Sequence, residues 1–302
     1  MSEKTDYCGR FAPSPTGSLH FGSLVAAVAS YADALHHQGR WLVRMEDVDE
    51  GRVVKGSADE ILSTLDSFGF EWEQAVLFQS LRKSRYRELL EWLRHQELAY
   101  SCSCSRREIA AHARRGIEGP VYPGTCRPGN GTGDISGKTV RVRTDRTEIC
   151  FEDRIQGRHC QVLERDIGDF VIHRADGYTA YQLAVVIDDA DQAINQVVRG
   201  ADLLLSTPRQ IYLQRLLGFP QPAYAHIPLV TDARGRKLSK QDQALPVRAD
   251  MPVQTLIAAW QFLQQRLPPE KPGSVREFWH WAARTWDISR IIIQPCQPAA
   301  TR

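Results

Sequence analysis

The feature that most constrains this chain is a segment with two prolines, two glycines and a histidine, placed where a strand would pass into a helix. It runs from Arg10 to Ser23 with the sequence RFAPSPTGSLHFGS. Prolines fix the backbone, and glycines allow a ligand to approach it closely. The first N–H groups of the following helix favour an anion in the turn. The segment predicts a rigid phosphate-binding corner, with a purely structural strand-to-helix turn as the alternative.

The sequence on either side of this corner predicts a β-α-β unit. Residues 7–12 read as a strand, and residues 40–46 read as the next one. Between them, apolar side chains recur at helical spacing from an N-cap at Ser23 to Gly39. Strands joined in this way run parallel, and a ligand is expected at their carboxyl ends.

Composition predicts an ordinary globular protein. The chain has 302 residues, enough for two domains, of which 42% are hydrophobic and 25% charged. A net charge of +2 does not by itself indicate a nucleic-acid binder. There is no apolar signal core and no apolar run of the ~20 residues that a membrane span needs. We therefore expect a cytoplasmic protein without membrane contact.

Downstream patterns predict further elements. Asp188 and Asp189 would end a buried strand on opposite faces, which disfavours joint metal chelation and favours a polar strand end that shapes the site. The tail from Gln294 is expected to be loose. The predicted elements are helices at 57–68, 84–98, 105–115, 208–217, 252–266 and 275–286, and strands at 139–143, 148–151 and 181–187.

A second phosphate-type segment, Lys237-Leu238-Ser239-Lys240, lies far downstream. It is either an exposed charged loop or a cationic loop that neutralises a triphosphate during group transfer. In the first segment, His20 would offer an imidazole donor to a phosphate oxygen.

Seven cysteines in a chain without an export signal favour reduced thiols or a metal site over disulfides. Cys102 and Cys104 have a nearby third thiol in Cys126, and structural zinc takes four ligands. The other cysteines have no evident partner and are interpreted as packing residues: Cys8, Cys150, Cys160 and Cys296.

The two phosphate-type segments together resemble the signature elements of the class I aminoacyl-tRNA synthetases. His20-Phe21-Gly22-Ser23 is similar to their HIGH element, and Lys237-Leu238-Ser239-Lys240-Gln241 to their KMSKS element. Four further segments resemble the glutamyl branch, so that the resemblance covers roughly residues 7–245. These are RFAPSPTG at 10–17, RMEDVD at 44–49, RGAD at 199–202 and TPRQ at 207–210.

This resemblance implies an α/β fold, with a Rossmann-like parallel sheet, an inserted zinc-containing α+β subdomain and a short helical C-terminal region. The implied divisions are 1–99 for the first half of the catalytic domain, 100–165 for the insertion, 166–245 for the second half with the KLSKQ loop, and 246–302 for the C-terminal region.

The resemblance also implies a reaction and the residues for it. The α-carboxylate of L-glutamate would attack the α-phosphorus of ATP, with magnesium, to give glutamyl-adenylate. Because that carboxylate is already ionised at neutral pH, no general base is needed. His20, Lys237 and Lys240 would be catalytic, with Gly22 and Ser239 also binding ATP. The implied glutamate-binding residues are Arg10, Phe11, Ala12, Pro13, Ser14, Glu46, Tyr181 and Arg199.

The loop Tyr122-Pro123-Gly124-Thr125-Cys126 resembles the zinc-binding loop of one branch of the family, in which tyrosine supplies a ligand. The implied ligands are Cys102, Cys104, Tyr122 and Cys126, and His112 is the conventional rival for the fourth position.

Only residues 241–302 follow Lys240, too few for a helical anticodon-binding region. The chain therefore resembles the short paralogues, the glutamyl-queuosine tRNA(Asp) synthetases. This implies tRNA-independent activation and transfer of glutamate to queuosine in the anticodon loop of tRNA(Asp), by a monomer. The alternatives are a truncated conventional glutamyl-tRNA synthetase, a nonenzymatic RNA-binding relic and a different nucleotidyltransferase of the same fold.

Overall fold

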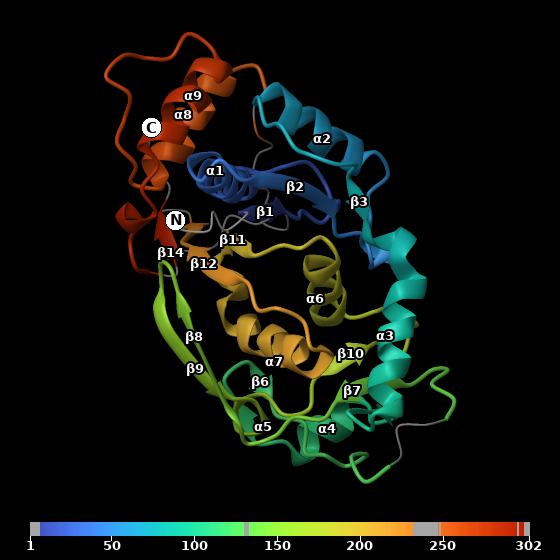
Figure 1. The fold of residues 1–302 in the computed structure, drawn as a ribbon. Coiled ribbons are helices and arrows are strands. Elements are labelled where there is room, and N and C mark those ends of the chain that lie inside the picture. Colours follow the sequence, from blue (N-terminus) through green and yellow to red (C-terminus); the bar gives the residue numbers. More distant parts are fainter. Residues whose placement is uncertain (1–6, 130–132, 232–246, 248, 295, 299–302) are drawn as a thin grey trace, which may run out of the picture.

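The predicted β-α-β unit is confirmed in the computed structural model, which describes residues 7–129, 133–231, 247, 249–294 and 296–298. β1 (Cys8–Phe11) and β2 (Arg40–Met45) pair in parallel, with Cys8 opposite Arg40. α1 (Phe21–His36) connects the two strands (Figure 1). Their carboxyl ends therefore point the same way, toward the corner at 12–20.

Two sheets continue from this unit. β2 pairs in parallel with β3 (Leu77–Phe78). A four-stranded sheet has the order β11-β12-β8-β9 and consists of β11 (Gln196–Gly200), β12 (Ala223–Ile227), β8 (Glu148–Asp153) and β9 (Gly157–Val162). β1 lies beside β11, and the Asn195 N–H donates to the Cys8 carbonyl over 3.1 Å. The two sheets thus meet at β1 and β11, and the carboxyl ends of both strands reach one region.

Five of the predicted helices are confirmed with small shifts at their ends. They cover the sheets and, in the case of α8 and α9, pack against α1 (Figure 1). These helices are α2 (Ser57–Ser67), α3 (Lys83–His95), α7 (Thr207–Leu217), α8 (Pro252–Phe262) and α9 (Val275–Thr285).

The cysteine-containing part of the chain forms a separate antiparallel sheet of order β10-β7-β4, with β4 (Ala99–Cys102), β7 (Thr139–Val142) and β10 (Val171–His173). The predicted basic helix is the shorter α4 (Arg106–His112), which Ser105 and Glu108 close with a capping box. Smaller elements are β5 (Arg115–Gly116), β6 (Gly119–Pro120) and α5 (Leu163–Asp166). In Figure 1 this region lies at the opposite end from α8 and α9.

The predicted strand at 181–187 is wrong, because these residues open the helix α6 (Tyr181–Asp191). Residues 183–189 are all buried, so the helix shows no polar face that would reveal its period. A short apolar run of this kind fits a buried helix and a buried strand equally well. The strand of this region is β11, which sequence patterns did not identify.

The interpretation of Cys150 and Cys160 as unpartnered packing residues is also wrong, because they form a disulfide. They lie directly opposite each other in the antiparallel β8–β9 ladder, with Cα atoms 4.1 Å apart. The sequence did not reveal this hairpin, and without its register the two thiols seemed unrelated.

The C-terminal tail is not loose throughout. β14 (Cys296–Pro298) pairs in parallel with β13 (Leu229–Thr231), which follows β12 directly. Its three residues carry no periodic signal, and only pairing with a distant strand orders them.

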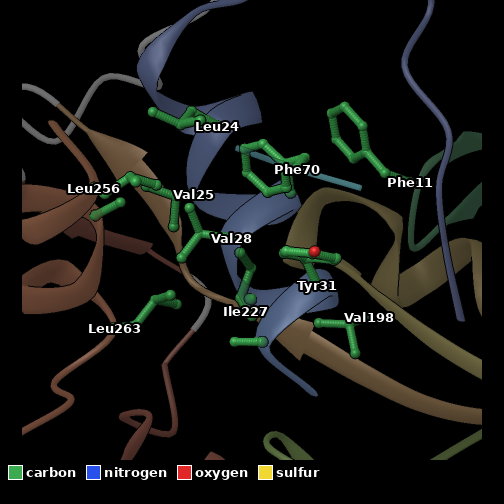
Figure 2. Close-up of a cluster of buried hydrophobic side chains, with 14 of the residues drawn as sticks. Phe11, Leu24, Val25, Val28, Tyr31, Phe70, Val198, Ile227, Leu256 and Leu263 are labelled. Carbon is green, nitrogen blue, oxygen red and sulfur yellow. The ribbon is translucent and has the colours of Figure 1, made fainter. Parts of the chain in front are cut away.

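The core around α1 holds the corner in place. Figure 2 shows Leu24, Val25, Val28 and Tyr31 of α1 among buried side chains of other elements. Val198 and Ile227 come from the sheet, and Leu256 and Leu263 from α8 and the residue after it. Each such side chain contributes about 1.5–3 kcal/mol on burial. Since these contacts come both from the sheet and from α8, α1 has little freedom to move relative to the sheet.

Asp33 on α1 bonds to side chains from three other segments of the chain. Its carboxylate accepts from the Tyr7 hydroxyl over 2.7 Å, from Trp286 Nε1 over 2.9 Å and from both Arg154 Nη atoms over 2.6 and 3.0 Å. Burial acts to raise the pKa of Asp33, but Arg154, Tyr7 and Trp286 outweigh it and hold the pKa below its usual value. The ionised carboxylate therefore stabilises the fold.

Replacing this carboxylate should destabilise the protein in a pH-dependent way. We expect Asp33→Asn to lower the free energy of unfolding by about 2–4 kcal/mol near neutral pH, because Arg154 loses its counter-ion. The lowered pKa means that Asp33 contributes fully above the usual carboxyl pKa of about 4 and loses its contribution as the pH falls through the folded value. Urea unfolding at several pH values should show the two proteins converging in acid. The exposed Asp66→Asn on α2 is the control, and an equal effect of both changes would refute the role of Asp33.

Candidate functional site

A cavity of about 500 Å³ opens where the carboxyl ends of β1, β2, β11 and β12 meet the start of α1. Besides apolar side chains, it is lined by Asp49, Gln79 and Asp202. Lys237, Ser239 and Lys240 lie outside the described residues. The predicted site residues that line the cavity are Arg10, Phe11, Ala12, Pro13, Ser14, His20, Gly22, Glu46, Tyr181 and Arg199.

The phosphate-type corner ends one turn earlier than the sequence predicted. The N-cap of α1 is His20, not Ser23, and His20 Nδ1 accepts from the Ser23 backbone N–H over 3.3 Å. The imidazole thus takes the place of the usual short polar cap. Because Nδ1 accepts, Nε2 is the ring nitrogen that carries a proton, and it lies 3.0 Å from Ser23 Oγ.

Gly17 shapes the loop before the helix. It adopts a φ of 136°, which favours glycine, and its backbone N–H and C=O both bond to Ser57 Oγ, over 3.0 and 2.8 Å. The loop is therefore fastened to the start of α2.

Asp189 joins two buried arginines at the floor of the site. Arg10 Nε donates to Asp189 Oδ1 over 3.2 Å, and Arg44 Nη2 donates to the same oxygen over 2.8 Å. Arg44 is fully buried, and its Nη2 also lies 3.4 Å from Glu46 Oε1. Burial acts to raise the pKa of Asp189, but Arg10 and Arg44 outweigh it and hold the pKa below its usual value. The two arginines are therefore paired with an ionised carboxylate.

Asp188, the neighbouring residue on α6, has different partners. Its carboxylate accepts from Gln79 Nε2 over 2.8 Å, from Arg82 Nε over 2.7 Å and from the Tyr86 hydroxyl over 2.8 Å. The prediction that these two aspartates end a strand on opposite faces is wrong, because both lie on the helix α6. Successive side chains on a helix are about 100° apart, so each aspartate meets a separate group. Gln79 lines the cavity, and its Oε1 is buried without a hydrogen-bond partner.

Among the described residues that line the cavity, Arg199 is a buried cation with no carboxylate partner. It is 5% exposed, and it donates from Nε to His226 Nε2 over 3.0 Å and from Nη2 to Thr207 Oγ1 over 2.9 Å. Its guanidinium also lies over the Tyr224 ring. Its Nη1 is buried and has no partner, and within the described part of the chain no carboxylate forms an ion pair with Arg199. A buried cation with a spare donor at a cavity wall suits an anionic ligand.

Glu46 and Tyr181 complete the polar lining. Burial raises the pKa of Glu46 above its usual value, against the opposing charges of Arg44 and Arg10. Burial likewise raises the pKa of Tyr181 to about 12, so its hydroxyl is a neutral donor at physiological pH. The cavity thus presents cationic donors, one carboxyl acceptor and one hydroxyl to a small ligand.

The cysteine cluster forms a second candidate site, far from the cavity. The Sγ atoms of Cys102, Cys104 and Cys126 lie within 4.8 Å of one another. The Tyr122 hydroxyl lies 3.4 Å from Cys102 Sγ and 3.8 Å from Cys104 Sγ. His112 is outside the cluster: its side chain is exposed, and its Nδ1 lies 3.2 Å from the Glu108 carbonyl. Three thiols and a phenolic oxygen supply the number of ligands that a structural zinc ion takes.

Sequence reasoning missed several residues that position the site. His226 and Thr207 bond to Arg199, and Asp153 bonds to His226. Arg44 bonds to Asp189, and Gln79 bonds to Asp188. Arg44 and Thr207 fall inside the segments RMEDVD and TPRQ, but the resemblance assigned neither of them a role. No local pattern marks His226 or Asp153, because their significance depends on strands that are far apart in the chain.

Comparison with known proteins places this arrangement in a family. The family described as "tRNA synthetases class I (E and Q), catalytic domain" matches residues 8–256. The chain is 52% identical over 291 residues to the glutamyl-Q tRNA(Asp) synthetase of Chromobacterium violaceum, covering 96% of this chain and 97% of that protein. It is 54% identical over 288 residues to the protein of that name from Dechloromonas aromatica, covering 94% and 95%.

A solved structure supports the fold. A glutamate tRNA ligase from Elizabethkingia meningosepticum, crystallised with its amino acid, superposes with a TM-score of 0.78 at 22% identity, covering 98% of this chain and 67% of that one. Within the described residues, no helix combines the length and apolarity needed to cross a bilayer.

Proposed function

Because the chain belongs to the class I tRNA synthetases (E and Q), and among them to the glutamyl-Q tRNA(Asp) synthetases, we propose that this ligase activates L-glutamate with ATP and transfers it to queuosine in tRNA(Asp). The observation that carries the glutamate assignment is Arg199, a buried guanidinium with an unpartnered donor at the wall of a cavity beside a helix N-terminus. A dicarboxylic amino acid supplies the missing anion.

In the proposed amino-acid pocket, different residues bind the different charged groups of the ligand. Arg199 is proposed to meet one carboxylate of the ligand, and Arg10, which also pairs with Asp189, is proposed to line the same pocket. Tyr181 adds a neutral hydroxyl donor. Glu46 accepts from the α-ammonium group, whose positive charge would also favour the ionised form of its carboxyl. Ser14 and the backbone of residues 11–13 close the pocket at the corner. This division of roles is specific for an amino acid with a second carboxylate.

The proposed activation step needs positioning rather than proton transfer. The α-carboxylate of glutamate attacks the α-phosphorus of ATP, pyrophosphate leaves, and glutamyl-adenylate forms. His20 Nε2 and the N-terminal N–H groups of α1 would stabilise the phosphate oxygens as charge develops. Lys237, Ser239 and Lys240 are proposed to act on the same phosphates, with magnesium supplying further charge neutralisation.

The proposed acceptor is a hydroxyl of queuosine at the wobble position of tRNA(Asp). Its attack on the adenylate carbonyl forms the ester and releases AMP. The cyclopentene diol of queuosine resembles the vicinal diol of a terminal ribose, so one active site would accept either geometry. A conventional glutamyl-tRNA synthetase that acylates a tRNA 3′ end remains the second candidate, and the identity of the acceptor separates the two.

We further propose that Cys102, Cys104, Tyr122 and Cys126 hold one structural zinc ion. Burial acts to raise the pKa of Cys102, but hydrogen bonds from Tyr122 and Arg141 outweigh it and bring the pKa to about 7. The thiol is thus readily deprotonated, as a metal ligand must be.

Glutamate activation should proceed without tRNA. We expect ATP–pyrophosphate exchange that depends on glutamate in tRNA-free protein, because the cavity already contains both proposed subsites. Arg199→Gln should lower the specificity constant for glutamate at least about 30-fold, since it removes a buried charge partner. The control is Arg158→Gln, an exposed arginine on β9, which should exchange like the parent protein. Absence of exchange in the parent protein would refute this step.

Transfer should depend on queuosine. Labelled glutamate should attach to tRNA(Asp) that carries queuosine and not to tRNA(Asp) with guanosine at that position. The label should stay with the tRNA after its 3′-terminal adenosine is removed. Labelling of tRNA(Glu), or equal labelling of both forms of tRNA(Asp), would favour the conventional synthetase instead.

The thiol cluster should contain metal. Elemental analysis of protein purified without chelators should find one zinc per chain. Tyr122→Phe should retain less than one, whereas His112→Ala should retain the full amount because His112 is outside the cluster. If only His112→Ala loses zinc, His112 rather than Tyr122 is the fourth ligand.

A further inference from the structure

A chain of buried hydrogen bonds connects Arg199 to two residues outside the cavity lining. Arg199 Nε donates to His226 Nε2 over 3.0 Å, and His226 Nδ1 lies 2.5 Å from Asp153 Oδ2. His226 is fully buried on β12, and Asp153 is 5% exposed at the end of β8. Neither side chain lines the cavity, so neither is available to touch the substrate.

The chain of bonds defines where every proton lies. Because Arg199 Nε is always a donor, His226 Nε2 must accept, and the proton of a neutral imidazole must therefore be on Nδ1, facing Asp153. Burial, reinforced by the charge of Arg199, lowers the pKa of His226 to about 4 against the opposing effect of Asp153, so the neutral form dominates at physiological pH.

The orientation of Asp153 is equally determined. Its Oδ1 accepts three backbone N–H groups, from Ile155, Gln156 and His226, over 2.9–3.0 Å. This leaves Oδ2 alone to face the imidazole. The carboxylate thus cannot rotate without breaking three bonds, and it holds the imidazole in a single tautomer.

The guanidinium is held on three sides. His226 Nε2 accepts a hydrogen bond from Nε, and Thr207 Oγ1 accepts one from Nη2 over 2.9 Å. The centroid of the Tyr224 ring lies 5.3 Å from the guanidinium carbon. Among the described residues, no group bonds to the remaining nitrogen, Nη1, which is buried.

We propose that Asp153 and His226 are positioning residues, which orient Arg199 so that its Nη1 meets a carboxylate of the amino-acid substrate. The proposal rests on the glutamate pocket proposed above. Since Arg199 meets the substrate before and during activation, its displacement weakens glutamate binding in both states. The consequence is a higher KM for glutamate with little change in kcat.

Two replacements of near-native shape test this role in ATP–pyrophosphate exchange. His226→Phe keeps an aromatic ring but removes both nitrogens. In Asp153→Asn the three backbone donors keep the amide oxygen at the Oδ1 position, so the amide NH₂ faces His226 Nδ1. The imidazole proton is then forced onto Nε2, where it opposes Arg199 Nε–H. We expect each change to raise the KM for glutamate about 10- to 100-fold and to leave the KM for ATP unchanged.

A conservative variant and a matched control complete the design. In His226→Gln, the amide oxygen accepts from Arg199 and the amide NH₂ donates to Asp153, so it should recover most of the loss seen with Phe. His159→Phe changes a neighbouring histidine on β9 that stacks on Phe151 and bonds to the Gln156 carbonyl rather than to Arg199, so it should behave like the parent protein.

The outcomes separate this proposal from the proposed function. If the parent protein shows no glutamate-dependent exchange, the proposed function fails. If it does, an unchanged glutamate KM in both His226→Phe and Asp153→Asn overturns the positioning role. A loss confined to kcat also overturns the positioning role, and so does an equal rise in the glutamate KM for His226→Gln and His226→Phe. The glutamate KM is the informative quantity because destabilisation alone would lower the fraction of active protein without a selective effect on glutamate.

Discussion

The buried carboxylate of Asp189 is the interaction on which the site depends. Arg10 and Arg44 come from two adjacent parallel strands, and both are almost completely removed from water. A buried guanidinium is tolerated only with a partner, so α6 has to dock with its aspartate against the carboxyl ends of β1 and β2. That docking brings Tyr181, the first residue of α6, to the cavity. Through the neighbouring Asp188 the same helix holds the segment that leads from β3 into α3, so one turn of α6 organises the floor of the cavity and the start of α3.

Charge then divides the arginines of the site by function. Arg44 is enclosed by Asp189, Glu46 and Gln192 and serves the structure. In the described part of the chain, the partners of Arg199 are uncharged, and they orient it without neutralising it. Neutral His226 suits this purpose, because a carboxylate in its place would satisfy the guanidinium and remove its attraction for a ligand. The proposed specificity for a dicarboxylic amino acid thus follows from the uncharged partners of Arg199, which leave its positive charge for a ligand carboxylate.

Much of this was predictable, and the failures have definite causes. The corner at 10–23, the β-α-β unit and five of the helices follow from glycine and proline chemistry and from apolar periodicity, which act within a few residues. The helix at 181–191 was mistaken for a strand because it is buried on nearly every side. The N-cap moved to His20 because an imidazole can accept the capping bond that a serine usually accepts. The disulfide between Cys150 and Cys160 depended on a hairpin register that no local signal revealed.

The sequence by itself determined the kinds of chemistry available: a phosphate-type corner, arginines and a glutamate for an amino-acid ligand, and thiols with a tyrosine for a metal. These are properties of residue types at short spacing. Only the tertiary structure decided that Asp189 faces Arg10 and Arg44, and that Asp153 reaches Arg199 through His226. Burial removes water as a competitor, so each buried polar group depends on a partner within the protein. The packing of distant strands and helices decides which partner comes within about 3 Å, and the separation of two residues in the sequence carries no information about it.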